Sequence, residues 1–159
     1  MRVAIGADHA GVALKARVKQ QLDERQVPYH DFGTSSDDSV DYPDFAISVA
    51  RSVASGASDR GILICGSGIG MAIAANKVKG IRAAPVTDTT AARLARQHND
   101  ANVLALGARA LDVDAALEIV ETFLATTFEG GRHQRRVDKI SAVEQTGANS
   151  DEHSSTDTR

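Results

Sequence analysis

The stretch that decides the fold reads Arg60-Gly-Ile-Leu-Ile-Cys65-Gly-Ser-Gly-Ile-Gly-Met-Ala-Ile-Ala-Ala-Asn-Lys77. An apolar run typical of a buried strand ends in Cys65, the only cysteine of the chain, and a glycine-rich turn and a helical pattern follow. Backbone amides at such a turn point outward and carry partial positive charge. A thiol held against them ionises more readily than a free thiol. One segment can therefore supply a base or nucleophile together with a cradle for negative charge, which points to an enzyme.

Strand-like and helix-like segments alternate along the rest of the chain. Short apolar runs predict strands over 2–6, 28–32, 60–65, 81–86 and 102–106. Helical periodicity predicts helices over 10–25, from 42 onward, and over 69–78, 87–98, 112–126 and 131–145. This alternation is typical of βαβ units, so we expect an α/β fold with a five-stranded parallel sheet covered by helices on both faces.

Composition limits the class of protein. The chain has 159 residues, of which 42% are hydrophobic and only 4% aromatic, so one domain with an aliphatic core is expected. A net charge of −3 weighs against a general nucleic-acid binder, and a single cysteine excludes a disulfide-built secreted scaffold. No apolar run reaches the roughly 20 residues of a membrane span, and the first residues do not resemble a signal peptide. We expect a cytoplasmic protein with no membrane partner.

We expect residues 1–146 to form the single domain. Residues 147–159 contain no large apolar side chain, which is typical of a disordered tail.

The expected sheet indicates where a ligand binds. In parallel sheets, ligands lie beyond the carboxyl ends of the strands, near the point where the strand order reverses. The residues that follow these strand ends, and that we therefore expect on one rim, are Asp8 and His9, the turn after Cys65, Thr87 and Asp88, and Arg109. Elsewhere, His98 and Asn99 end a predicted helix, and Arg132 and Arg136 share a helix face that suits a phosphate.

Each feature also has a structural explanation. Cys65 can be a core thiol, and Asp8 can be a helix N-cap beside a solvated His9. A cationic His98 can stabilise the C-terminus of its helix through the helix dipole. The arginines can form a solvated face. The glycine turn is neither a P-loop nor a dinucleotide fingerprint. Taken together, the thiol, carboxylate, imidazoles, amides and arginines, without a metal-ligand cluster, favour proton transfer on a small phosphorylated molecule.

The chain resembles the type B ribose-5-phosphate isomerases, within the family that includes the galactose-6-phosphate isomerase subunits. The matching stretches are Gly6-Ala-Asp-His-Ala-Gly11, Asp41-Tyr-Pro43, Gly61-Ile-Leu-Ile-Cys-Gly-Ser-Gly-Ile-Gly70, Ala74-Ala-Asn-Lys77, Gly80-Ile-Arg82, Arg96-Gln-His-Asn99 and Gly131-Arg-His-Gln-Arg-Arg136. The resemblance implies a Rossmann-like three-layer αβα sandwich that forms a homodimer, or a dimer of dimers, with active sites at the subunit interface. It also implies interconversion of D-ribose 5-phosphate and D-ribulose 5-phosphate in the pentose phosphate pathway, without metal or cofactor.

The resemblance also implies catalytic roles. One branch of the family uses a cysteine base at the position of Cys65, and another uses a glutamate where this chain has Met71, so this chain resembles the cysteine branch. His98, reaching in from the partner subunit, would open the sugar ring, and Asp8 would assist. Ser67 would stabilise the enediolate together with the turn amides.

The implied substrate-binding residues fall into three groups. They are the turn residues Gly66, Gly68, Ile69 and Gly70 for the enediolate, His9, Arg109, Arg132 and Arg136 for the phosphate, and Tyr42 and Asn99 for the sugar.

Three other functions stay open from the sequence. The same chemistry suits an isomerase of allose or galactose 6-phosphate, because pocket depth cannot be read from the sequence. A non-catalytic sugar-phosphate-binding module on the same fold is a second alternative. A dinucleotide-binding protein is a third, which the glycine spacing disfavours.

Overall fold

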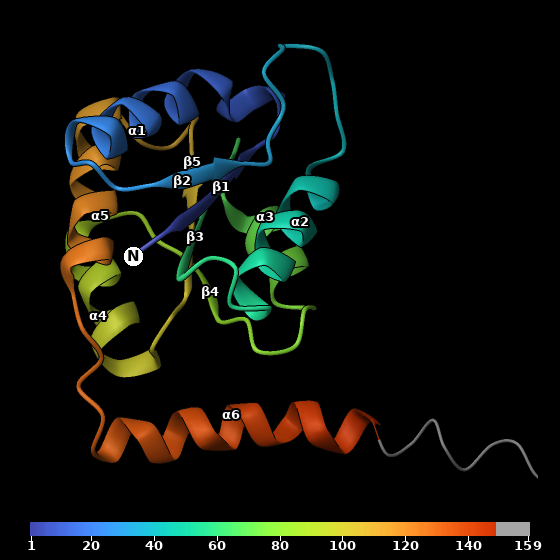
Figure 1. The fold of residues 1–159 in the computed structure, drawn as a ribbon, viewed down its shortest axis with the longest axis vertical. Helices are drawn as coiled ribbons and strands as arrows, with labels where there is room; N and C mark the ends of the chain where they lie inside the picture. Colours follow the sequence, from blue (N-terminus) through green and yellow to red (C-terminus); the bar gives the residue numbers. More distant parts are fainter. Residues whose placement is uncertain (149–159) are drawn as a thin grey trace, which may run out of the picture.

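The structure, a computed structural model, describes residues 1–148 and forms a three-layer αβα sandwich (Figure 1). Five parallel strands make one sheet in the order β2-β1-β3-β5-β4. The strands are β1 (Val3–Ala7), β2 (Tyr29–Asp31), β3 (Arg60–Cys65), β4 (Ala83–Pro85) and β5 (Val103–Gly107). The predicted α/β class and parallel sheet are confirmed.

Helices cover both faces of the sheet because the strands bury residues on both sides. They are the 3-10 helix η1 (His9–Gly11) and the α-helices α1 (Val12–Glu24), α2 (Tyr42–Ala54), α3 (Ile69–Ala75), α4 (Thr89–Asn99), α5 (Val113–Ala125) and α6 (Arg132–Ala148). Ile62 and Ile64 of β3 pack with residues of α1, α4 and α5, whereas Leu63 and Cys65 pack with α2 and α3. Successive side chains of β3 point to opposite faces of the sheet, so α1, α4 and α5 cover one face and α2 and α3 cover the other.

The order of the strands predicts where a ligand binds. The chain leaves β1 towards β2 on one side, and β3 lies on the other side of β1, so the order reverses between β1 and β3. Cys65 ends β3, and Asp8 directly follows β1. The backbone N–H of Asp8 also donates to the carbonyl oxygen of Ile64 at 3.1 Å, which ties the two strand ends together. These two polar residues therefore lie at the position where open α/β sheets bind ligands.

Several predicted boundaries differ from the observed ones. β2 and β4 have only three residues each, shorter than the predicted 28–32 and 81–86, as edge strands often are. The first helix begins at Val12 after η1, because Asp8 caps that short turn. Helix α6 ends at Ala148, three residues past the predicted end of this helix at 145. The remainder of the predicted tail, residues 149–159, lies outside the described residues.

Helix caps follow the sequence in part. Asp88 is the N-cap of α4, and its side chain accepts from the N–H of Ala91 at 2.7 Å. Asp41 occupies the N-cap position of α2, as predicted, but its side chain makes no capping hydrogen bond. Among residues 1–148, no helix has the length and apolar character needed to cross a bilayer.

Candidate active site

A cavity of about 910 Å³ opens at the carboxyl edge of the sheet. Its lining residues are Asp8, Tyr42, Cys65, Gly66, Ser67, Ile69, Gly70, Pro85, Val86, Thr87, Arg109 and Ala110. The expected rim is therefore observed in part, since residues after β1, β3, β4 and β5 all reach this cavity, whereas His9 and Asp88 do not line it. Sequence reasoning placed Thr87 on the rim but missed Pro85, Val86 and Ala110, whose only signal was their closeness to the strand ends.

Cys65 is held against a backbone amide at the inner end of the cavity. Only 4% of the residue is exposed, and the N–H of Gly68 donates to Sγ at 3.1 Å. Gly68 adopts φ 78°, and a Cβ there would lie 2.9 Å from the carbonyl carbon of Leu106. Glycine thus lets the turn fold back on the sulfur. The sulfur therefore has a hydrogen-bond donor of the backbone directed at it.

Two side chains flank the glycine turn. The ring of Tyr42 lies on Gly70 so closely that an added Cβ would be 2.7 Å from Cζ of the tyrosine. The guanidinium of Arg109 lies over Gly66, with Nη1 3.2 Å from the position of a Cβ. The backbone N–H of Arg109 donates to the carbonyl oxygen of Gly66 at 3.0 Å. An aromatic surface and a positive charge therefore border the turn on different sides.

Ser67 and Ile69 lie at the mouth of the cavity. Ser67 Oγ accepts a hydrogen bond from the N–H of Ile69 at 3.2 Å, so the hydroxyl caps the first turn of α3. Ile69 leaves 57% of its surface exposed. A large apolar side chain at the mouth is suited to contact with another molecule.

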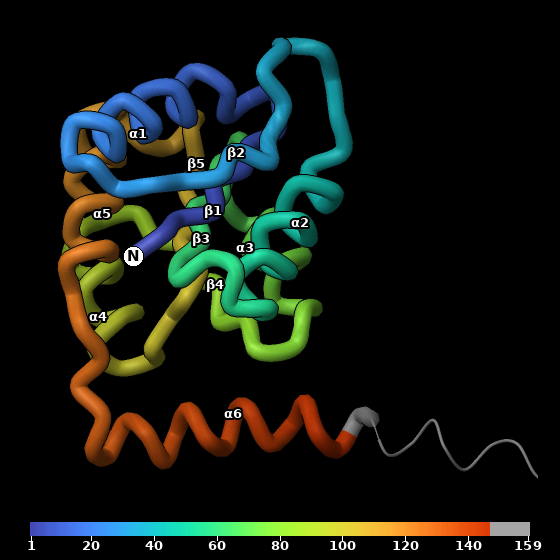
Figure 2. The backbone as a smooth tube through the Cα atoms, in the orientation of Figure 1, coloured from blue at the N-terminus to red at the C-terminus, as the bar shows by residue number. Residues whose placement is uncertain are grey.

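Asp8 caps the short helix η1 and also lines the cavity. Its Oδ1 accepts from the N–H groups of Ala10 and Gly11, at 3.0 and 3.2 Å, which confirms the N-cap explanation. Asp8 is also 6% exposed and lines the cavity. His9 does not line it: its Nδ1 accepts from the N–H of Val40 at 3.3 Å, which anchors the long arch between β2 and α2 seen in Figure 2.

The remaining predicted site residues lie elsewhere in the chain. Helix α4 starts near the cavity and runs back along its 11 residues, about 16 Å, so that His98 and Asn99 reach the opposite edge of the sheet. Helix α6, which carries Arg132 and Arg136, begins there and contacts α4. Within residues 1–148 the candidate site is thus divided into two half-sites at opposite ends of α4.

Hydrogen bonds from two arginines stabilise the C-terminal end of α4. Arg96, 2% exposed, donates through Nη1 to Oδ1 of Asp100 at 2.8 Å and to the carbonyl oxygen of Ala101 at 2.6 Å. Arg82 donates through Nε to the carbonyl oxygen of Asn99 at 3.0 Å. These contacts give His98 and Asn99 a defined backbone position.

A second cavity, of about 600 Å³, lies between the sheet edge and α6. It is lined by Asn76, Ile81, Arg82, Ala83, Ala84, Asn99, Ala101, Ile140, Val143 and Glu144. Ile140 and Val143 of α6 are 50% and 69% exposed. Figure 1 shows α6 extending along this edge, away from the other helices. An apolar face exposed in this way is typical of a surface that contacts another chain.

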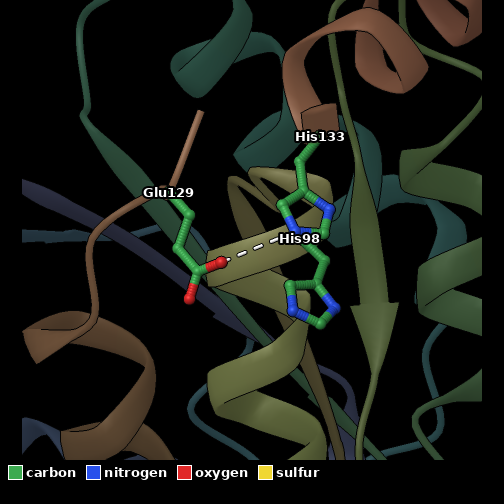
Figure 3. A group of neighbouring side chains, drawn as sticks. All are labelled: His98, Glu129 and His133. Carbon is green, nitrogen blue, oxygen red and sulfur yellow. Dashed lines mark ion pairs between the residues drawn. The ribbon is translucent and has the colours of Figure 1, made fainter. Parts of the chain in front are cut away.

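Sequence reasoning missed a cluster formed by His98, Glu129 and His133 (Figure 3). The imidazoles of His98 and His133 stack with centroids 4.1 Å apart and planes 8° from parallel. Oε2 of Glu129 lies 3.5 Å from Nε2 of His133. Burial lowers the pKa of His133, and the charges of His98, Arg132 and Arg136 lower it further, while Glu129 opposes them.

These residues do not fit a metal ion as arranged. Two histidines and a glutamate form a donor set that zinc uses, and their ligand atoms lie within 4.8 Å of one another. However, parallel stacked rings direct their lone pairs into separate planes, so both cannot meet one ion. Nε of Arg132 also donates towards Nε2 of His133 at 3.5 Å, which competes with a cation for that nitrogen.

Comparison with known proteins gives a consistent result. The family described as Ribose/Galactose Isomerase matches residues 3–140. Ribose-5-phosphate isomerase B of Escherichia coli (strain K12) is 49% identical over 144 residues, covering 91% of this chain and 97% of that protein. A putative sugar phosphate isomerase of Bacillus subtilis (strain 168) is 53% identical over 146 residues, covering 91% and 98%.

Solved structures extend the likeness to three dimensions. Ribose-5-phosphate isomerase B of Clostridium thermocellum superposes with a TM-score of 0.91 at 53% identity, covering 92% of this chain and 99% of that one. Ribose-5-phosphate isomerase B of Mycoplasma genitalium, solved with bound ribulose-5-phosphate, gives 0.88 at 46% identity and covers 91% and 96%.

Proposed function

Because the chain belongs to the ribose/galactose isomerase family, we propose that it interconverts D-ribose 5-phosphate and D-ribulose 5-phosphate, with Cys65 as the base. The observation that carries the proposal is the position of the sulfur, at the inner end of the cavity and against the N–H of Gly68. The relative with bound ribulose-5-phosphate supports the substrate, since it matches 91% of this chain at 46% identity. The pentose phosphate pathway is the setting that this reaction implies.

The proposed reaction moves one proton between neighbouring carbons. The thiolate of Cys65 takes the proton from C2 of the open-chain aldose, and an enediolate forms as the electrons shift towards O1. The thiol then returns the proton to C1 as the carbonyl forms at C2, so the sulfur ends as it began. Asp8, which lines the same cavity, is suited to move the proton between O1 and O2.

The turn after Cys65 supplies electrostatic stabilisation in this proposal. Charge develops on the enediolate oxygens beside the amides of residues 66–70, which lie at the start of α3. Hydrogen-bond donors directed at such a position would stabilise the transition state without reorganising. The N–H groups of Gly68 and Ile69 already donate to Cys65 Sγ and Ser67 Oγ, so this role falls to the other amides of the turn. Ser67 adds a hydroxyl, and Arg109 over Gly66 adds a positive charge.

The other half of the site belongs, in our proposal, to a second copy of the chain. His98, Asn99, Arg132 and Arg136 lie at the far end of α4 from Cys65, too distant to serve the same cavity within one chain. The exposed apolar face of α6 supports a homodimer that brings each end to its partner's cavity. There His98 would open the furanose ring, and the arginines would hold the phosphate. The resemblance assigns His9 to the phosphate as well, although its Nδ1 accepts from the N–H of Val40 and His9 does not line the cavity.

Replacing Arg136 by alanine is expected to raise KM for ribose 5-phosphate about 10- to 100-fold, with kcat changed much less. A charge-assisted bond to phosphate is worth about 1.5–3 kcal/mol and is made in the ground state as well as the transition state. Steady-state kinetics measure this. Arg135→Ala, an exposed neighbour on the same helix, is the matched control and should behave as wild type. An unchanged KM for Arg136→Ala would remove Arg136 from the phosphate site.

The function itself is tested by a coupled assay with purified protein and a chelator. We expect ribose 5-phosphate to be converted to ribulose 5-phosphate at an undiminished rate in the presence of EDTA. Allose 6-phosphate and galactose 6-phosphate, assayed in parallel, test the six-carbon alternative. Faster turnover of either would reassign the substrate, and binding of all three sugars without turnover would indicate a non-catalytic module.

A further inference from the structure

We propose that His133 is a positioning residue for His98: its imidazole, packed face to face on that of His98, holds the ring-opening group in its working orientation. The inference rests on the proposed function, in which His98 acts on the sugar ring. His133 itself touches neither the cavity lining nor, in this proposal, the substrate.

The contact is built by three segments of the chain. His98 ends α4, where it is half-buried, while His133 lies in the first turn of α6 and is only 4% exposed. The ring centroids are 4.1 Å apart and the planes 8° from parallel, so the two imidazoles are stacked (Figure 3). Because His98 is only half-buried, a buried ring stacked on it restricts its rotamer.

The loop before α6 brings His133 to this place. The N–H of Glu129 donates to the carbonyl oxygen of Gln97 at 3.1 Å, which attaches the loop to the end of α4. Gly130 and Gly131 both have positive φ, 66° and 54°, a pair of left-handed residues that turns the chain sharply into α6. The N–H of His133 then donates to the carbonyl oxygen of Gly130 at 3.0 Å. Two consecutive glycines are thus used to seat one buried histidine.

The charges around His133 agree with this role. The groups that face it are His98 from α4, Arg132 and Arg136 from α6, and Glu129 from the loop. Burial and the three cationic groups lower the pKa of His133 against the influence of Glu129. The surroundings of His133 therefore disfavour a positive charge on its ring, which agrees with a packing role for this imidazole.

The test compares two substitutions that separate stacking from the imidazole itself. His133→Ala removes the stack and is expected to lower kcat for ribose 5-phosphate about 10- to 100-fold, because a misplaced catalytic group costs this much. His133→Phe keeps an aromatic face and should restore most of the loss. Gln134→Ala, an exposed neighbour on α6, is the control and should match wild type.

A double-mutant comparison shows whether His133 acts through His98. In a His98→Asn background, where the residual rate depends on spontaneous ring opening in solution, His133→Ala should cause no further loss. Loss that persists in that background, or equal loss in the Ala and Phe variants, would overturn the proposal.

An NMR measurement separates this inference from the proposed function. Stacking places the ring protons of His98 over a neighbouring ring, so they should be shifted upfield in wild type and in His133→Phe, but not in His133→Ala. A protein without isomerase activity would refute the function while still showing this pattern. An unshifted His98 signal in an active wild-type enzyme would refute the positioning role alone.

Discussion

Cys65→Ser is expected to lower kcat for ribose 5-phosphate about 10²- to 10⁴-fold, the share that a positioned base commonly supplies. A hydroxyl is a far weaker acid than a thiol, so serine in place of Cys65 would not supply the anionic base that the proposed mechanism requires. The substitution is nearly isosteric, and Cys65 contributes to a core cluster with Met71 and Leu63, so the fold should be retained.

Binding and kinetics together make this result specific. The affinity for ribitol 5-phosphate, a reduced ligand that cannot isomerise, should change by no more than about two-fold, because the phosphate contacts lie elsewhere. Met71→Leu, a volume-conserving change in the same cluster, is the control and should retain activity. Near wild-type turnover by Cys65→Ser would remove the sulfur from the mechanism.

The second large effect is recovery of activity from two inactive chains. One chain carries Cys65→Ser, and the other carries both His98→Asn and Arg136→Ala. Each alone forms only defective sites. In a mixed dimer, one site combines the intact Cys65 of the second chain with the intact His98 and Arg136 of the first. Random mixing should therefore restore about a quarter of the wild-type activity.

The control for this experiment pairs two changes in the same half-site. In a mixture of Cys65→Ser and Asp8→Asn chains, both cavities of every dimer are damaged, because Cys65 and Asp8 line the same cavity of each chain. No recovery is expected there. If the first mixture also stays inactive, although tagged chains show that mixed dimers form, the half-sites are not shared between subunits.

Much of the fold could be predicted because the relevant patterns are local. The apolar run ending at Cys65 and the alternating helices identify a parallel sheet, and the topology rule then brings Asp8, Cys65 and Arg109 to one edge. Edge strands were predicted too long, since β4 pairs on one side only and ends at Pro85. The pattern of apolar residues indicates which residues are buried, but it does not indicate where the hydrogen bonding between strands ends.

The division of the candidate site into two half-sites was harder to predict from the sequence. Residue chemistry grouped His98 and Arg132 with Cys65, but they lie at the far end of α4 in one chain, and only the family resemblance predicted that a partner subunit supplies them. The stack of His98 on His133 was not predicted, because it depends on the turn at Gly130 and Gly131 and on tertiary packing. The paired glycines before a basic stretch were the available signal, and they indicate a sharp turn without revealing which side chain it seats.

The 4% exposure of Cys65 has a consequence for oxidative damage. A sulfur that works as an anion is open to conversion into sulfenic acid, and further oxidation is irreversible. With so little surface, this sulfur is reached through the substrate cavity, and a bound sugar phosphate lies in that path. If Cys65 is the base, a bound substrate would therefore protect the sulfur from peroxide.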